Sequence, residues 1–273
     1  MFAKLLFFFV TLQLIRNLFR QTDKRKQKND SMKKVLFAVL TLGMLTSCSC
    51  HGVKMDWYKT EAHGEETRSI TGFERIFLQG SLDVKYMQSD SFMVKVDAPV
   101  EVIKNVETRV EGNVLKIKMK GEGRFLNFGV SSTDGVTVYV TSPDFLGVSL
   151  QGSGDFECQG LLDTDNLDIE LQGSGDILFD DIICDKVDVS VLGSGDVKLK
   201  NVKTQQSVNE VVGSGDIKIH YDNSGDVQST IVGSGDITLS GQVKRSTYEI
   251  RGSGDMHTDN LLVKEEKTET IIK

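Results

Sequence analysis

The sequence predicts an all-β fold, a right-handed parallel β-helix (solenoid) with coils of about 20 residues. The first observation is a tetrapeptide, Gly-Ser-Gly-Asp (GSGD), which recurs at steps of 21, 20, 20, 20 and 19 residues. The second is a period-two alternation of apolar and polar residues on both sides of each copy, which is typical of β-strands. Residues 151–263 are therefore assigned to a regular GSGD solenoid.

Apolar residues fall into columns when the coils are aligned on the tetrapeptide. Coils stacked in register at about 4.8 Å would place these columns inside and the charged residues between them outside. The columns are Phe156, Ile177, Val197, Ile217, Ile237 and Met256 directly after each copy; Cys158, Phe179, Leu199, Ile219, Leu239 and Thr258 two residues further on; and Leu150, Leu171, Val191, Val211, Ile231 and Ile250 two residues before it.

The tetrapeptide itself suits a sharp corner between two parallel sheets. Such a corner needs a positive φ and leaves no room for a Cβ facing the next coil, and glycine meets both needs. The structural turn glycines are Gly152, Gly154, Gly173, Gly175, Gly193, Gly195, Gly213, Gly215, Gly233, Gly235, Gly252 and Gly254.

The corner aspartates are the one constellation suited to binding chemistry. Carboxylates about 5 Å apart repel each other, and a Ca²⁺ ion shared between neighbours would offset this repulsion. The favoured alternative is that each carboxylate accepts a hydrogen bond from a backbone N–H of its own turn. We therefore predict no cofactor and keep a weak calcium ladder as a hypothesis. The six residues are Asp155, Asp176, Asp196, Asp216, Asp236 and Asp255.

The flanking segments are less regular. Residues 67–150 keep the strand alternation, and Gln79-Gly80-Ser81-Leu82-Asp83 looks like a degenerate copy of the motif, so this part is either irregular coils or a β cap. The lysine- and glutamate-rich residues 264–273 are predicted to be a charged C-terminal cap that protects the last strand from edge pairing.

The N-terminus has the features of an export signal. Residues 32–47 contain two lysines, an apolar run and small residues before Cys48, which is the order of a lipoprotein signal peptide ending at a lipidated cysteine. The apolar run is too short to span a bilayer. Residues 48–66 are predicted to be a polar tether. Residues 1–31 are interpreted as an over-extended start, with a signal anchor or a long n-region as alternatives.

Charge narrows the classes of function. The 273 residues include 32 Lys/Arg and 39 Asp/Glu, and the 23 basic and 37 acidic residues that follow Cys48 give that part a net charge of −14. An acidic surface without a basic stripe disfavours nucleic-acid binding. Histidines and serines have no recognised catalytic spacing, and we identified no basic column beside the acids of an outer sheet, so we predict no enzymatic activity.

Three segments together carry a family resemblance: residues 72–76 (GFERI), residues 80–84 (GSLDV) and residues 115–118 (LKIK), followed by serial GSGD. Over about residues 68–260 the chain resembles the head GIN domain family of auto-transporter adhesins, common in Bacteroidetes. The resemblance implies a secreted β-helix, often lipid-anchored, with no catalytic residues to carry over.

The predicted function combines these observations. We expect a cell-envelope lipoprotein, anchored in the outer membrane and facing the periplasm or the surface, that displays a scaffold for binding an envelope polymer, a carbohydrate or a protein. The alternative is a β-helix that binds or processes carbohydrate, which a groove lined by aromatic and acidic residues on one sheet would favour.

Overall fold

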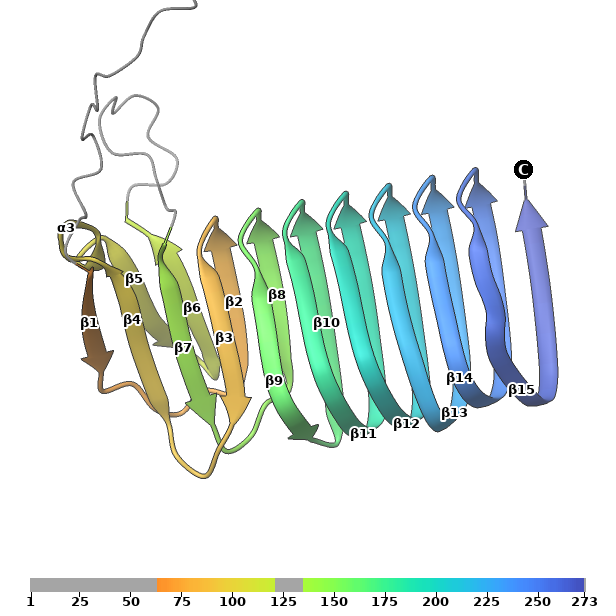
Figure 1. Ribbon diagram of the computed structural model, residues 1–273, viewed down its shortest axis with the longest axis horizontal. Helices are drawn as coiled ribbons and strands as arrows, with labels where there is room; N and C mark the ends of the chain where they lie inside the picture. Colours follow the sequence, from red (N-terminus) through yellow and green to blue (C-terminus); the bar gives the residue numbers. More distant parts are fainter. Residues whose placement is uncertain (1–62, 121–134, 273) are drawn as a thin grey trace, which may run out of the picture. The chain divides into compact units, whose positions relative to one another are not determined.

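The described part of the chain is built almost entirely from β-strands (Figure 1). The computed structural model describes residues 63–120 and 135–272, where the single helix is the short α3 (Val100–Ile103). Nothing helical within these ranges has the length and apolar composition of a bilayer span. The strands are β1 (His63–Arg68), β2 (Arg75–Gly80), β3 (Asp83–Gln88), β4 (Met93–Pro99), β5 (Val106–Glu111), β6 (Val114–Met119), β7 (Thr137–Ser142), β8 (Gly147–Gly152), β9 (Phe156–Asp163), β10 (Asn166–Gly173), β11 (Asp176–Gly193), β12 (Asp196–Gly213), β13 (Ile217–Gly233), β14 (Ile237–Gly252) and β15 (Met256–Ile272).

The regular part is a two-sheeted solenoid (Figure 1). Sheet 1 contains β3, β9 and the first halves of β11–β15, and sheet 2 contains β2, β8, β10 and the second halves of the same long strands. Neighbouring coils pair in parallel, so that Gly173 of β10 lies opposite Gly193 of β11. The predicted all-β solenoid with coils of about 20 residues is confirmed.

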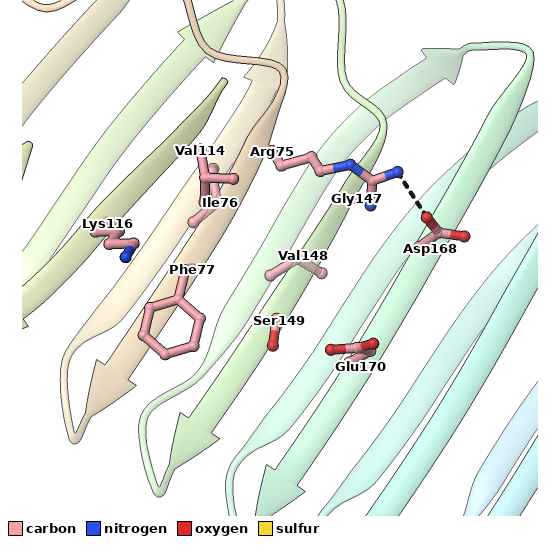
Figure 2. Close-up of a pocket in the computed structure, with 10 residues that line it drawn as sticks. All are labelled: Arg75, Ile76, Phe77, Val114, Lys116, Gly147, Val148, Ser149, Asp168 and Glu170. Carbon is pink, nitrogen blue, oxygen red and sulfur yellow. Dashed lines mark hydrogen bonds and ion pairs between the residues drawn. The ribbon is translucent and has the colours of Figure 1, made fainter. Parts of the chain in front are cut away.

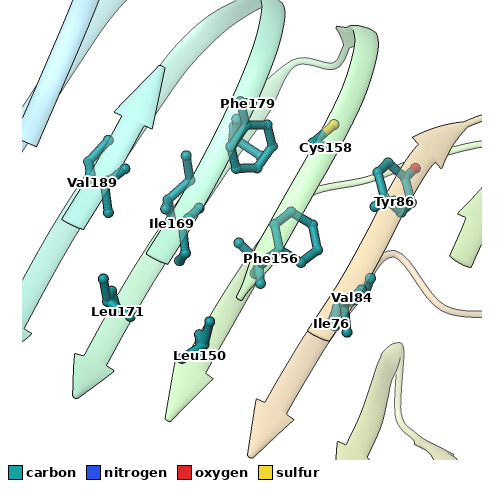
Figure 3. Packing of buried hydrophobic residues seen from close by; sticks show 14 of the residues in the cluster. Ile76, Val84, Tyr86, Leu150, Phe156, Cys158, Ile169, Leu171, Phe179 and Val189 are labelled. Atoms are coloured by element: carbon teal, nitrogen blue, oxygen red, sulfur yellow. The ribbon is translucent and has the colours of Figure 1, made fainter. Parts of the chain in front are cut away.

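The core lies between the two sheets and consists of the predicted columns. From Leu150 to Ile250, every residue of the three columns is buried, whereas Met256 and Thr258 of the last coil are half-buried because no further coil covers them. Aromatic rings extend through the core at the N-terminal end, where the ring centroids of Phe156 and Phe179 lie 5.6 Å apart (Figure 3). Like residues thus stack on like residues along the solenoid.

The degenerate copy at residues 79–83 forms the corner of the first coil. Gly80 lies opposite Gly152 in the parallel pairing of β2 with β8. Asp83 Oδ1 accepts a hydrogen bond from the Asp155 backbone N–H at 3.1 Å. Leu82 replaces the second glycine and is fully buried. Residues 67–150 therefore contain a true coil, although its sequence departs from the repeat.

The remaining strands of this region close the N-terminal end of the solenoid. Sheet 1 continues through β7 and β4 to β1, and sheet 2 continues through β6 to β5, with antiparallel pairing at both outer strands. Strand β1 begins at His63, so its first four residues fall inside the predicted tether. It is an edge strand of polar composition, so it lacks the alternation that marks half-buried strands.

The charged C-terminal segment is the second half of β15. Lys267 and Glu269 pair with Ser246 and Tyr248 of β14 and thus lie in the inward columns. Lys267 Nζ is 3.0 Å from Glu269 Oε1 and 5.6 Å from the centroid of the Tyr248 ring. Inward-pointing charges on a terminal strand disfavour the addition of another strand. The protection of this end from edge pairing stays a prediction.

Two inward columns of sheet 2 that are apolar in β11 become polar in β12, which the sequence analysis did not predict. Ser207, Asn209 and Ser229 are buried in sheet 2 around the hydroxyl of Tyr221. The Tyr221 hydroxyl lies 2.8 Å from Ser207 Oγ and accepts a hydrogen bond from Asn209 Nδ2 at 3.1 Å. These groups satisfy one another, which is the condition for polar atoms in a core.

Candidate functional site

The outer face of sheet 2 has an open depression of about 360 Å³ over β6, β2, β8 and β10 (Figure 2). This volume lies in the range of small-molecule sites, roughly 300 to 1,000 Å³. Its lining residues are Arg75, Ile76, Phe77, Val114, Lys116, Gly147, Val148, Ser149, Asp168 and Glu170.

The hollow exists because β8 presents only small residues there. Gly147 and Ser149 alternate with the buried residues Val148 and Leu150, so β8 contributes little outward bulk between β2 and β10. A Cβ on Gly147 would lie 2.4 Å from the carbonyl oxygen of Asp168 and 3.1 Å from Arg75 Nη1. Glycine is therefore required at the floor of the depression.

One row across the depression is held by an ion pair. Arg75, Gly147 and Asp168 occupy the same register position on β2, β8 and β10. The Arg75 side chain extends over Gly147, and its Nη2 donates to Asp168 Oδ2 at 2.6 Å (Figure 2). Because both side chains are more than one third exposed, the pair contributes little to folding but fixes the guanidinium in place.

The second row contains Lys116, Phe77, Ser149 and Glu170, one residue from each of the four strands (Figure 2). The Phe77 ring is half-buried and lies beside the small side chain of Ser149. Lys116 also bonds Glu111 on β5, and this hydrogen bond, together with the charge of Arg109, lowers the pKa of the Glu111 carboxyl. The ionised Glu111 carboxylate on β5 is therefore the partner of Lys116 at the edge of the depression.

The two rows define the chemistry available at this surface. The aromatic ring offers an apolar face, Arg75 and Lys116 donate hydrogen bonds, and Asp168 and Glu170 accept them. The two positive and two negative side chains balance, so the depression is close to neutral on a strongly acidic chain. Such a site suits a ligand that both donates and accepts hydrogen bonds and has apolar faces.

The predicted aspartate ladder lies at the corners, away from this depression. The favoured alternative expected each carboxylate to accept a hydrogen bond within its own turn. Instead, five of the six bond to the neighbouring coil: each Oδ1 from Asp155 to Asp236 accepts the backbone N–H of the corner aspartate in the next coil. Asp216 Oδ1, for example, accepts from the Asp236 N–H at 2.8 Å. The reason is geometric, because the stacked corners place the next N–H directly beside each carboxylate.

The predicted turn glycines are required at the same corners for two different reasons. The first glycine of each copy has a φ between 129° and 143°. The second has an ordinary φ, but an added Cβ would lie 2.0 to 2.2 Å from a backbone oxygen of the preceding coil. Gly215, for example, would place a Cβ 2.2 Å from the carbonyl oxygen of Gly195.

Two further predictions concern lipid and metal. The lipidation site Cys48 lies outside the described residues. Within residues 63–120 and 135–272, no group of three or more His, Cys, Asp or Glu side chains is arranged to hold a metal ion. The calcium ladder stays a hypothesis that needs a binding measurement.

The sequence analysis missed the depression. It predicted no basic column beside the acids of an outer sheet and did not identify the single pair of Arg75 with Asp168, which are 93 residues apart in the sequence. A signal was present: Arg75, Gly147 and Asp168 each stand five residues before an aligned corner glycine, at Gly80, Gly152 and Gly173. Aligning the degenerate copy with the regular copies would have placed these residues in one row.

The fold defines a class of protein, a β-solenoid, and this one has a small recess on its outer face. The family described as "Putative auto-transporter adhesin, head GIN domain" matches residues 72–209 and 199–269. The chain belongs to this family, as its sequence motifs predicted. No curated protein matches the chain.

Solved structures share the fold. A protein from Bacteroides fragilis described as a "putative adhesin" is 24% identical with a TM-score of 0.60, covering 78% of this chain and 98% of its own. A second, from Parabacteroides merdae and described in the same words, is 19% identical with a TM-score of 0.55, covering 77% and 96%. At these identities the likeness concerns architecture, and residue roles must come from this chain itself.

Proposed function

We propose that the protein is a lipid-anchored adhesin of the cell envelope that binds its ligand through the outer face of sheet 2. The family supports adhesion at an extracellular or surface location. The signal-like residues 32–47 and Cys48 support an anchor, and a polar tether would hold the solenoid away from the membrane. A single acyl chain binds membranes only marginally, so stable anchoring would need more than one chain on the cysteine.

The observation that carries this proposal is the neutral depression around Arg75, Phe77 and Ser149. The regular coils present mostly rows of small and charged side chains, whereas this surface combines an aromatic ring with fixed donors and acceptors. We propose binding rather than catalysis because the family is described as adhesins.

The anchor is tested by labelling growing cells with an alkyne fatty acid. The wild-type chain should carry the label and sediment with the outer membrane, and Cys48→Ser should lose both properties. Cys50→Ser is the matched control and should keep them. Equal labelling of wild type and Cys48→Ser would overturn the anchored part of the proposal.

The adhesive part is tested with a deletion strain. We expect cells that lack the protein to attach less to surfaces coated with purified mucin or with plant and yeast polysaccharides, and wild-type complementation to restore attachment. Attachment that is equal with and without the protein on every surface would overturn the adhesin proposal.

A further inference from the structure

We propose that the depression on sheet 2 binds a neutral carbohydrate chain, with Phe77 stacking against a sugar ring and Arg75, Asp168 and Glu170 bonding its hydroxyl groups. This inference rests on the proposed binding function and names its ligand class. Four observations support it: the shape of the floor, the aromatic ring, the matched polar groups and the charge balance.

The floor has the shape that a flat ring requires. Ser149 leaves an open strip over β8 between the bulkier side chains of Phe77 and Glu170, and the Arg75 side chain, which lies over Gly147, borders this strip (Figure 2). The close approach of the Asp168 carbonyl oxygen to Gly147 excludes any larger residue there. A pyranose ring has one face of C–H groups and can lie on such a strip.

The aromatic ring supplies the apolar contact. Phe77 is an outward residue of β2 and half-buried among the lining residues. An aromatic ring prefers partners that present positively polarised hydrogens to its face, and the C–H groups of a sugar are of this kind. On the outer face of sheet 1, by comparison, the Tyr139 ring is already covered by Lys95, whose Nζ is 4.8 Å from the ring centroid.

The polar groups match the hydroxyl groups of a sugar. A hydroxyl donates one hydrogen bond and accepts others, so it is satisfied where a carboxylate and a cation stand together. Arg75 and Asp168 form such a pair at 2.6 Å, and the ion pair fixes both side chains before a ligand arrives. Glu170 and Lys116 provide a second acceptor and a second donor in the neighbouring row.

Charge decides between classes of polymer. A polyanion would meet Asp168 and Glu170 in the site and the net charge of −14 on the chain after Cys48. A polycation would be attracted to the acidic surface as a whole and would gain nothing specific from this depression. A neutral oligosaccharide is the polymer that the balanced charges of the site favour.

The experiment measures binding of defined oligosaccharides to the full chain purified in mild detergent. The probes are cellohexaose, maltohexaose, mannohexaose and chitohexaose, with hexagalacturonate as the anionic comparison, followed by calorimetry and saturation-transfer NMR. Phe77→Ala removes the aromatic face, and Ser149→Met fills the floor while keeping the four charged residues of the site. Tyr139→Ala is the matched control because it removes an outward aromatic from the other sheet.

We expect at least one neutral hexasaccharide to bind, with about tenfold or greater loss of affinity in Phe77→Ala and in Ser149→Met and no change in Tyr139→Ala. Circular dichroism of each variant establishes that it is folded. Binding of hexagalacturonate alone, binding that both variants leave unchanged, or no binding of any neutral probe would overturn the inference. If the deletion strain still attaches poorly in that case, the adhesin function stands and only the ligand class fails.

Discussion

Nη2 of Arg75 lies 2.6 Å from Oδ2 of Asp168, although the strands that carry them are separated by β8. The contact is possible because Gly147 stands between them and offers no side chain. A gap in the outer face of one strand thus allows its two neighbours to interact. The same gap forms the floor of the candidate site.

Arg75→Met should separate the role of this pair in binding from its role in folding. Both side chains are more than one third exposed, so we expect the free energy of unfolding to fall by less than about 1 kcal/mol. The loss of binding free energy for the oligosaccharide should be larger than the loss of unfolding free energy, because the variant loses a charge-assisted donor. Urea unfolding and calorimetry on the same preparation provide both numbers. A variant that is strongly destabilised and binds normally would contradict this account.

Gly215→Ala and Gly160→Ala should separate steric from conformational requirements. Gly215 has an ordinary φ, but a Cβ would lie 2.2 Å from the Gly195 carbonyl oxygen. Gly160 has a φ of 76° and no atom within 4 Å of an added Cβ. We expect Gly160→Ala to cost about 1 to 2 kcal/mol of unfolding free energy and Gly215→Ala to cost clearly more or to prevent folding. Equal costs, measured by urea unfolding, would argue against close stacking of the corners.

Asp216→Ala should lower the free energy of unfolding by about 1 kcal/mol, because it leaves the Asp236 backbone N–H without its acceptor. Asp216→Asn should cost less, since the amide oxygen can still accept and one repulsive charge is removed. Thermal unfolding tests whether stability falls in the order wild type, Asp216→Asn, Asp216→Ala.

The same thermal unfolding curves, recorded in calcium and in chelator, test the hypothesis that the aspartate ladder binds calcium. Because each Oδ1 already accepts an N–H, we expect equal midpoints in both buffers. A midpoint that rises in calcium for the wild type and not for Asp216→Asn would instead identify the ladder as a metal site.

Tyr221 should make the fold sensitive to alkali. Burial raises the pKa of its hydroxyl from 10.0 to about 12, against the lowering effect of its hydrogen bonds with Ser207 and Asn209. The folded state therefore holds this proton more tightly, so the stabilisation is complete below pH 10 and is lost as the pH rises through about 12. The loss should be on the order of 2 kcal/mol. Urea unfolding between about pH 9 and about pH 12 should give a shallower decline in the free energy of unfolding for Tyr221→Phe than for the wild type.

The periodic part of the fold could be predicted because each coil repeats the same physical requirement. Val191, Val211 and Ile231 stand in one column, so a single alignment places all three inside. The strands that close the N-terminal end of the solenoid could not be predicted in this way. These strands pair antiparallel or join distant parts of the chain, and β1, a polar edge strand, shows no alternation of apolar and polar residues.

The candidate site was hidden for a related reason. It depends on the register between one degenerate coil and two regular coils, and Leu82 in place of glycine makes the degenerate copy difficult to align. The buried polar residues around Tyr221 could not be recognised because serine and asparagine in a strand resemble outward residues until the partners that satisfy them are known.

The most direct test of the central claim, that the outer face of sheet 2 is the adhesive surface, is attachment of living cells. The deletion strain is complemented with wild type, Ser149→Met or Tyr139→Ala at equal surface amounts, and attachment is measured on the polysaccharide that wild-type cells prefer. We predict that Ser149→Met attaches no better than the deletion strain and that Tyr139→Ala attaches like the wild type. Normal attachment by Ser149→Met would contradict the account.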